Sequence, residues 1–276
     1  MNITKAIIPV AGWGTRRLPI TKTIEKCMLP VGNRPIVDYV VQDCLKAGIT
    51  DIIFVVSEQS DQIRHYYRSN IDLNDYLKRN DKVDLLEKVR PINANLHFVV
   101  QPSYGKYGSA VPVSLAAQYL EPGESVVVVS GDDFIYNADG SSEIARLITS
   151  TPDGANGILG VVVPQDDTLI PRYGFMETNE QSELVRIVEH PDPEPAMFIK
   201  NVSKYLFNHS MIQAICSDVA QERESGEYGM FDAFEDEIAK GAVVRVVPTV
   251  GQYLDGGNVK SWLVANEVVI GTEYRE

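Results

Sequence analysis

Short apolar runs that alternate with helix-like stretches constrain the fold of this chain more than any other feature of its sequence. The apolar runs lie at residues 5–10, 52–56, 96–100, 126–130, 158–163 and 243–247. The stretches with helical periodicity lie near residues 36–47, 109–119, 141–149, 210–224 and 231–240. Continuous apolar runs are typical of strands covered by helices on both faces. The sequence therefore predicts an α/β fold with a mostly parallel sheet flanked by helices.

The segment at about residues 61–95 departs from this pattern. It is rich in Asp, Asn, Lys and Arg, and its apolar residues recur at roughly helical spacing: Leu73, Tyr76, Leu77, Leu85 and Leu86. We interpret it as a polar helical insertion on the surface. Because no internal repeat and no long linker divides the chain, residues 1–276 are predicted to form a single domain.

The charge of the chain argues against nucleic acid as a partner. Its formal net charge is −13, whereas a surface that binds a nucleic-acid backbone needs an excess of lysine and arginine. A local basic cluster nevertheless occurs near the N-terminus, at Arg16, Arg17, Lys22 and Lys26. This cluster favours a small anionic ligand held inside a pocket.

The sequence predicts a cytoplasmic protein without a membrane partner. No apolar run reaches the ~18 residues of a membrane span, and the N-terminal run is too short for a signal peptide. The three cysteines, Cys27, Cys44 and Cys216, are odd in number and unevenly spaced. We expect free thiols rather than disulfides or structural zinc.

The strongest local signal is the turn that follows the first apolar run. Residues 11–16 read Ala-Gly-Trp-Gly-Thr-Arg, and Gly12 and Gly14 allow backbone amides to approach phosphate oxygens. Thr15, Arg16 and Arg17 would add donors on the same turn. The pattern is neither GxxxxGK[ST] nor GxGxxG, which disfavours an ordinary ATPase or a dinucleotide-dependent oxidoreductase. A tight connection without a ligand is the plainer alternative.

Two further features fit phosphoryl chemistry. Lys26 lies where the chain can return over the turn, so that its ammonium could neutralise a transferring phosphoryl group, although a lone lysine is more often solvated. Asp132 and Asp133 follow the four valines 126–129, at the strand end where open α/β sheets bind ligands. A carboxylate there, with Asp255 from a later loop, could hold magnesium, or these aspartates could cap helices.

Together these motifs resemble the sugar-1-phosphate nucleotidyltransferase family, in particular its bacterial glucose-1-phosphate uridylyltransferase branch. The resemblance runs from Ala6 to about Val268. Beyond the AGxGTR turn and Lys26-x-x-Leu-Pro, it rests on a series of motifs in the family's order: Gln101, Gly108-Ser109-Ala110-Val111, Gly131-Asp132, Tyr173-Gly174, Val188-Glu189-His190-Pro191, Gly226-Glu227 with Asp232-Ala233, and Asp255-Gly256-Gly257-Asn258.

The resemblance implies a fold, a reaction and a site. The fold is a Rossmann-like mixed, mostly parallel sheet with a small lobe on the sugar side. In the reaction, an oxygen of the sugar-1-phosphate attacks the α-phosphorus of a nucleoside triphosphate in line and releases pyrophosphate. The substrates implied are UTP and glucose-1-phosphate, the cofactor is Mg²⁺, and the protein is expected to be a homo-oligomer.

The residue roles implied by the resemblance fall into four groups. They are catalysis by Arg16 and Lys26; nucleotide binding by Ala11, Gly12, Gly14, Thr15, Gln101, Gly108 and Asp132; sugar-phosphate binding by Gly174, Glu189 and His190; and magnesium binding by Asp132 and Asp255. Asp133 is the alternative to Asp132 if the register differs by one residue.

The chain departs from the family pattern at three positions that bear on the substrate. His190 replaces a lysine that would hold the sugar phosphate, Glu25 replaces a proline beside Lys26, and Ser109 replaces a histidine. These departures leave other hypotheses open: another sugar-1-phosphate, dTTP in place of UTP, or a paralogue that binds sugar nucleotides without turnover.

Overall fold

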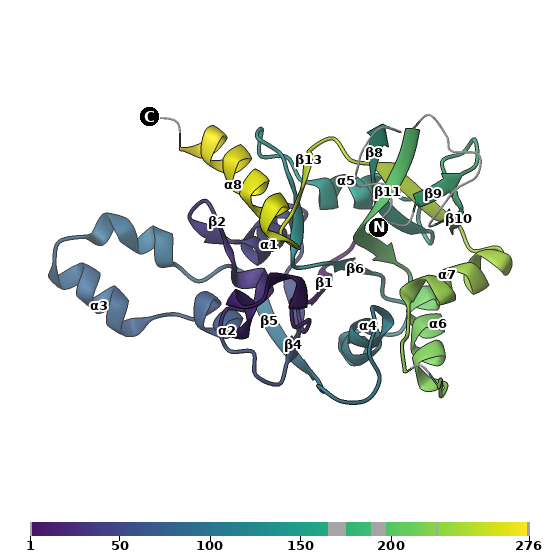
Figure 1. The fold of residues 1–276 in the computed structure, drawn as a ribbon, viewed down its shortest axis with the longest axis horizontal. Coiled ribbons are helices and arrows are strands. Elements are labelled where there is room, and N and C mark those ends of the chain that lie inside the picture. The colour runs from purple at the N-terminus through teal and green to yellow at the C-terminus, as the bar shows by residue number, and fades with distance from the viewer. Residues whose placement is uncertain (1, 165–174, 189–196, 225, 275–276) are drawn as a thin grey trace.

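A mixed sheet lies at the centre of the molecule (Figure 1). The computed structural model describes residues 2–164, 175–188, 197–224 and 226–274, and the sheet has nine strands within these residues. Four of them run parallel side by side, and each coincides with an apolar run of the sequence: β5 (Asn95–Gln101), β4 (Asp51–Ser57), β1 (Lys5–Pro9) and β6 (Val126–Val129). The predicted parallel core is confirmed.

The other half of the sheet is largely antiparallel. Its long strand β11 (Met197–Phe207) runs antiparallel to β6 and to β8 (Asn156–Pro164). The remaining strands of this half are β9 (Phe175–Thr178), β10 (Leu184–Val188) and β12 (Val244–Pro248). Two short ladders accompany the sheet, β7 (Asp133–Tyr136) with β13 (Gln252–Asp255) and β2 (Pro30–Val31) with β3 (Arg34–Pro35).

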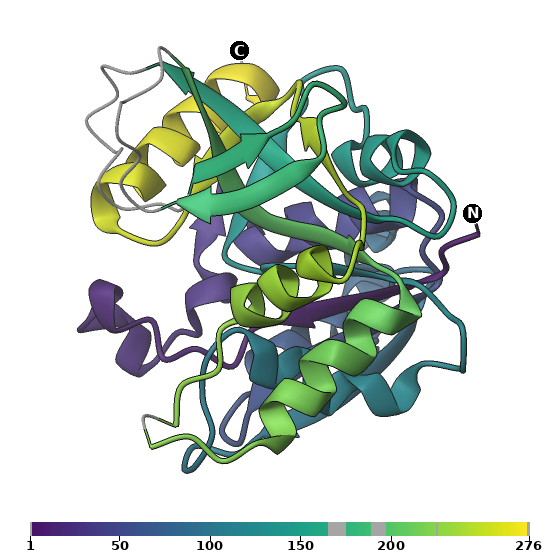
Figure 2. The same ribbon diagram turned by 90° about the vertical axis from the view of Figure 1, so that its right-hand side faces the viewer.

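Helices cover both faces of the sheet. One face packs against α1 (Ile36–Lys46), α5 (Glu143–Ser150) and α8 (Val259–Glu273), and the other against α4 (Ala110–Ala116), α6 (His209–Ala220) and α7 (Met230–Ala239). In Figure 2, α6 and α7 lie in front of the sheet. Successive strand residues serve the two faces alternately, so that Ile8 joins one apolar core and Ile7 the other. This division explains why the parallel strands are apolar throughout.

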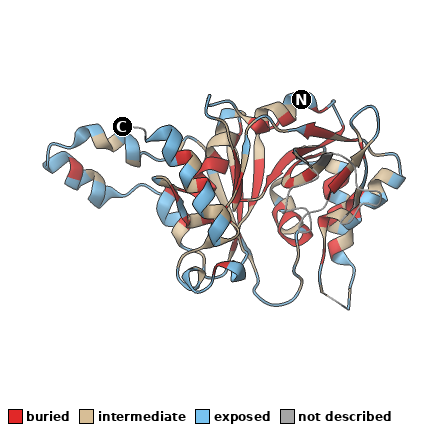
Figure 3. Cartoon of the chain, turned by 45° about the horizontal axis from the view of Figure 1, so that its top comes forward, coloured by how far each residue is buried: buried red, intermediate tan, exposed pale blue. Residues whose placement is uncertain are grey.

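The polar segment at 61–95 is helical, as its spacing predicts. It contains α2 (Gln62–Tyr67), α3 (Ile71–Arg79) and a 3-10 turn at Val83–Val89. In Figure 3 it projects to the left and is mostly exposed. Its first helix is anchored in the core, because Ile63 and Tyr67 of α2 belong to the apolar core and the Tyr67 ring stacks on Phe54. In α3, Leu77 is the buried residue.

Several elements were not predicted from the sequence, among them the long strand β11 and the C-terminal helix α8. Polar residues interrupt the apolar pattern of β11, and Lys200 and Lys204 of this strand are buried. The helix α8 has apolar side chains around much of its circumference, including exposed Leu263 and Ile270, so it lacks a clear amphipathic stripe. In the part of the chain that the structure describes, no helix has the length and apolar character of a membrane span.

Candidate active site

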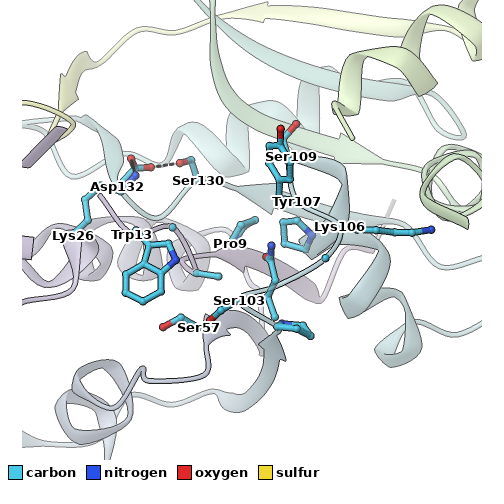
Figure 4. A pocket seen from close by; sticks show the side chains of 17 residues that line it. Pro9, Trp13, Lys26, Ser57, Ser103, Lys106, Tyr107, Ser109, Ser130 and Asp132 are labelled. Atoms are coloured by element: carbon cyan, nitrogen blue, oxygen red, sulfur yellow. Dashed lines mark hydrogen bonds and ion pairs between the residues drawn. The ribbon is translucent and has the colours of Figure 1, made fainter. Parts of the chain in front are cut away.

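A cleft of 540 Å³ opens at the carboxyl ends of the parallel strands (Figure 4). In the strand order β5-β4-β1-β6, the next two strands of this sheet in the chain, β4 and β5, lie on one side of β1, and β6 lies on its other side. Open α/β sheets bind ligands at such a switch point. The lining comes from the ends of all four strands: Ala11, Gly12 and Trp13 after β1, Ser57 of β4, Gln101 to Ser103 at the end of β5, and Ser130 and Asp132 after β6.

A second cleft, of 280 Å³, adjoins the first. The two share Lys26, Ser130 and Asp132 as lining residues. The second cleft is also lined by Gly14, Thr15, Arg16, Asp133, Asn201, Ser203, Tyr253, Asp255 and Gly257. It therefore lies between the glycine-bearing turn, the antiparallel strand β11 and the end of β13.

Lys26 and Asp132 form an ion pair where the two clefts meet. Asp132 also accepts a hydrogen bond from the Ser130 hydroxyl, which is drawn as a dashed line in Figure 4. About a quarter of each side chain is exposed, 26% for Lys26 and 24% for Asp132. Both groups are thus partly desolvated but still reachable from the cleft.

The ion pair fixes the charge of both partners. Burial by itself would lower the pKa of Lys26, but the Asp132 carboxylate outweighs burial and raises that pKa. Burial by itself would raise the pKa of Asp132, yet the Lys26 ammonium and the Ser130 hydroxyl lower it. Near neutral pH the site therefore presents a cation and an anion side by side.

Asp133 has a different environment from its neighbour. Its carboxylate pairs with buried Lys204 and accepts a hydrogen bond from the Tyr253 hydroxyl at 2.9 Å. Burial raises the pKa of Asp133 to about 6 in spite of the nearby Lys204 ammonium. The Asp132 side chain is 24% exposed and lines both clefts, whereas the Asp133 side chain is 12% exposed and lines only the second. Asp132 is therefore the better candidate for a ligand-facing carboxylate.

Asp255 faces the second cleft at the end of β13. It accepts hydrogen bonds from the Gly257 amide at 2.6 Å and from the Ser261 hydroxyl at 3.3 Å. The β13–β7 ladder places Asp255 opposite Asp133, and the Gly256 amide donates to the Asp132 carbonyl at 3.2 Å. Carboxylates from residues more than a hundred positions apart in the chain are thereby brought to one cleft.

The two cleft-facing carboxylates, Asp132 and Asp255, fit a magnesium ion. Mg²⁺ takes oxygen ligands, usually only one or two from carboxylates, and completes its shell with phosphate oxygens and water. Within the described residues, no group of three or more His, Cys, Asp and Glu side chains could hold a metal by itself. The donor set therefore suits a metal that arrives with a phosphate ligand.

Arg17 does not take the position expected for it. Instead of joining the phosphate turn as a donor, its side chain is 4% exposed and donates to the carbonyls of Gly256 at 3.2 Å and Asn258 at 2.7 Å. Its guanidinium also lies over the Trp262 ring, 5.0 Å from the centroid. Arg17 therefore ties the turn to the loop that carries Asp255, and Arg16 alone of this pair lines a cleft.

Gly108 and Ser109 shape the far wall of the first cleft. Gly108 has a φ of +111°, and a Cβ atom there would lie 2.3 Å from the Tyr228 carbonyl oxygen. The Ser109 hydroxyl accepts a hydrogen bond from the Met230 amide at the start of α7, at 3.0 Å. The glycine is required for close backbone approach, and the serine connects the cleft wall to α7.

The structure brings together every predicted site residue that it describes. Ala11, Gly12, Gln101 and Gly108 line the first cleft, Gly14, Thr15, Arg16 and Asp255 line the second, and Lys26 and Asp132 line both. Gly174, Glu189 and His190 lie outside the described residues. Four further residues line the second cleft without having been predicted: Ser130, Asn201, Ser203 and Tyr253. The Ser-Gly-Asp-Asp run offered a signal for Ser130, whereas the others lie on strands that were not predicted.

The fold and the cleft define a class of protein. It is a Rossmann-like α/β protein with a phosphate-type turn and two carboxylates at the switch point of its sheet. The nucleotidyl transferase family model matches residues 5–270. This chain therefore belongs to the nucleotidyl transferase family, and it is an enzyme of the nucleotidyltransferase class.

Relatives within this family are similar over most of the chain. A UTP-glucose-1-phosphate uridylyltransferase of Staphylococcus epidermidis is 32% identical over 242 residues, which cover 85% of this chain and 81% of that protein. A UTP-bound UGPase from Acinetobacter baumannii superposes with a TM-score of 0.85 at 25% identity, covering 97% of this chain and 93% of that chain. A UDP-glucose pyrophosphorylase structure from the same organism gives a TM-score of 0.84 at 27% identity, covering 100% and 95%.

Proposed function

We propose that this protein makes UDP-glucose and pyrophosphate from UTP and glucose-1-phosphate. The observation that carries the proposal is the pair of adjoining clefts that share Lys26 and Asp132. One cleft is large enough for a nucleotide, since ligand pockets measure about 300–1,000 Å³. The other, smaller cleft is suited to the sugar phosphate, and the similar proteins that are named for this reaction support the choice of substrates.

In the proposed mechanism the phosphates lie where the two clefts meet. The amides of the Gly12–Gly14 turn and the guanidinium of Arg16 would hold the triphosphate. An oxygen of glucose-1-phosphate attacks the α-phosphorus, the bond from this phosphorus to the bridging oxygen breaks, and pyrophosphate leaves with the electron pair. No nucleophilic side chain is required, so that the rate depends on positioning and on neutralisation of charge.

Lys26 is proposed to neutralise the charge that develops on the transferring phosphoryl group. Its ammonium is paired with Asp132, and a phosphate oxygen would take the place of this carboxylate. Asp132 and Asp255 would hold Mg²⁺, which when bound supplies positive charge to the phosphate oxygens. The exchange of partners keeps both charged groups paired before and after binding.

Gln101 is proposed to recognise the base. It lies at the end of β5 and lines the larger cleft together with Ala11 and Gly12 of the glycine-bearing turn. A side-chain amide both donates and accepts, which matches the edge of a neutral pyrimidine such as uracil. Gly108 would let the backbone of the facing wall approach the nucleotide closely.

The substrates are tested by pyrophosphate release with Mg²⁺, for UTP, dTTP, ATP, CTP and GTP, each with glucose-1-phosphate and galactose-1-phosphate. The expected result is selective release with UTP and glucose-1-phosphate. Preference for dTTP or for the other sugar would replace the substrate assignment but keep the reaction class. Tight binding of UDP-glucose without any release would favour the binding paralogue.

Residues 1–276 are proposed to act as one domain that assembles into a homo-oligomer. Contacts between Arg17 and the 256–258 loop join the two ends of the chain at the site. The outer face of α8 exposes Leu263, Val264 and Ile270, with exposed fractions of 55%, 44% and 48%, and could pack on a second copy. Light scattering coupled to gel filtration would test this, because a monomer at all concentrations contradicts it.

A further inference from the structure

Glu25 immediately precedes Lys26 in the chain, but its carboxylate forms its hydrogen bonds with a distant segment. It accepts hydrogen bonds from the Ser60 hydroxyl at 2.6 Å and from the amides of Asp61 at 3.1 Å and Gln62 at 2.9 Å. These donors lie at the beginning of α2. The carboxylate thus caps the N-terminus of a helix that follows it by more than thirty residues.

Gln62 completes the connection in the opposite direction. Its side-chain oxygen accepts a hydrogen bond from the Glu25 amide at 2.9 Å, and its side-chain nitrogen donates to the Thr23 carbonyl at 2.8 Å. Five hydrogen bonds therefore join residues 23–25 to residues 60–62. We refer to this set as the Glu25–Gln62 clamp.

The clamp connects the core to the catalytic lysine. On one side, α2 is fixed by Ile63 and Tyr67, which are 0% and 5% exposed. On the other side, Lys26 begins the next turn and its side chain lies against the phosphate turn, since a Cβ atom at Gly14 would be 3.0 Å from the Lys26 Cβ. Glu25 lines neither the 540 Å³ cleft nor the 280 Å³ cleft, so its connection to Lys26 runs through the backbone and through α2.

The alternative to a positioning role is that Glu25 only stabilises the fold locally. The clamp, however, joins the lysine-bearing segment to the base of the 61–95 insertion rather than to its own neighbours in sequence. We propose that Glu25 is a positioning residue, and that the Glu25–Gln62 clamp holds Lys26 in line with the transferring phosphoryl group. This inference rests on the proposed nucleotidyl transfer and adds a role for the insertion, whose first helix supports the catalytic lysine.

The kinetic test uses Glu25→Ala, Gln62→Ala and the double variant. A misplaced catalytic group can cost up to about 10²-fold in rate, so we expect each single variant to lower kcat by about 10-fold or more. KM for the triphosphate should change little, because the phosphate turn and Gln101 are intact. The double variant should fall to the level of the lower single variant, since both remove the same connection.

Two comparisons separate positioning from general stability. Glu25→Gln keeps an acceptor for the amides and should restore part of kcat. Asp75→Ala removes a carboxylate that pairs with Arg79 on the exposed surface of α3 and should leave kcat unchanged. In a Lys26→Met background, Glu25→Ala should have no further effect on kcat. An equal loss in both backgrounds would overturn the proposal, because Glu25 would then act independently of Lys26.

A measurement without turnover keeps the inference separate from the reaction. The rate at which an amine-reactive label modifies Lys26 is compared with that of Lys78, an exposed lysine on α3, by mass spectrometry of the folded protein. If the clamp holds Lys26 against Asp132, Glu25→Ala and Gln62→Ala should raise the relative labelling of Lys26 several-fold. Unchanged labelling would overturn the clamp even in an active enzyme, and raised labelling in a protein that releases no pyrophosphate would contradict only the proposed function.

Discussion

The parallel and antiparallel halves of the sheet carry the two sides of the site in different ways. In the parallel half, apolar strands end in loops, and the loops supply the groups that face the larger cleft. In the antiparallel half, polar residues lie within the strands themselves, as Asn201, Ser203 and Lys204 do on β11. The lining of the larger cleft can thus be recognised from strand ends, whereas the lining of the smaller cleft also depends on which residues of β11 and β13 face inward.

Replacement of Lys26 should have the largest effect on activity. It tests whether the reaction takes place at the carboxyl ends of the parallel strands. Lys26→Met removes the ammonium where the clefts meet, and we expect kcat/KM to fall by about 10³-fold because one preorganised electrostatic contact is lost. Pyrophosphate release measures this. Lys78→Met, a matched change of an exposed lysine on α3, should keep full activity; equal rates for both variants would contradict the role of Lys26.

Replacement of Asp132 should have the second-largest effect on activity and should change its dependence on Mg²⁺. Asp132→Asn keeps the shape of the side chain but removes the negative charge, so kcat should fall about 10²-fold and more Mg²⁺ should be needed for half-maximal rate. A Mg²⁺ titration at saturating substrates checks both effects. If Asp139→Asn, at an exposed turn after β7, raised the Mg²⁺ requirement equally, the effect would not belong to the cleft.

Gly108→Ala tests whether the wall of the larger cleft at Gly108 and Ser109 depends on backbone shape. The new methyl group would meet the Tyr228 carbonyl, and the positive φ is unfavourable for alanine. We expect a loss of roughly 2 kcal/mol in the free energy of unfolding, measured by denaturant titration. Gly105→Ala is a useful comparison, since its φ is also positive but no atom lies within 4 Å of the new Cβ, so it should cost less.

Gln101→Ala should weaken binding of the base without altering the sugar side. Loss of hydrogen bonds worth about 1.4 kcal/mol corresponds to a roughly tenfold rise in KM for UTP. KM for glucose-1-phosphate should stay within about twofold. Steady-state kinetics with each substrate varied in turn would measure the two KM values separately. An equal rise in KM for UTP and for glucose-1-phosphate would contradict the proposal that the two substrates bind in different halves of the site.

The pH dependence of stability should show the smallest effect. Because the pKa of Asp132 is lowered in the folded protein, mainly by Lys26 against the opposing effect of burial, its ionised form stabilises the fold above the unfolded value of about 3.9. This contribution is lost as the pH falls through the folded pKa. The difference in unfolding free energy between the wild type and Asp132→Asn should therefore shrink below about pH 4, and a constant difference would contradict the ion pair.

The sequence predicted the parallel half of the fold and the residues at its strand ends. Continuous apolar runs such as 126–129 identify buried strands, and the residues that follow them meet at one edge because the strands are parallel. The same reasoning did not predict β11, whose buried lysines resemble a surface segment. Nor did it predict α8, whose apolar residues follow no single stripe.

Side-chain direction was the other feature that sequence could not supply. Arg16 and Arg17 are adjacent and chemically equivalent, yet only Arg16 faces a cleft. Asp132 and Asp133 likewise differ in their partners. Glu25 is next to Lys26 in the sequence, but its carboxylate contacts the start of α2 instead. In each case tertiary contacts with distant segments decide the outcome.

The most direct test of the central claim is the stoichiometry of products from UTP, glucose-1-phosphate and Mg²⁺, followed by chromatography of the nucleotides together with a pyrophosphate assay. We expect UDP-glucose and pyrophosphate to form in equal amounts, with no phosphate and no UMP, because a single in-line displacement joins the two substrates. Pyrophosphate without a nucleotide sugar, or no product from folded protein, would contradict the proposal that these clefts transfer a uridylyl group to glucose-1-phosphate.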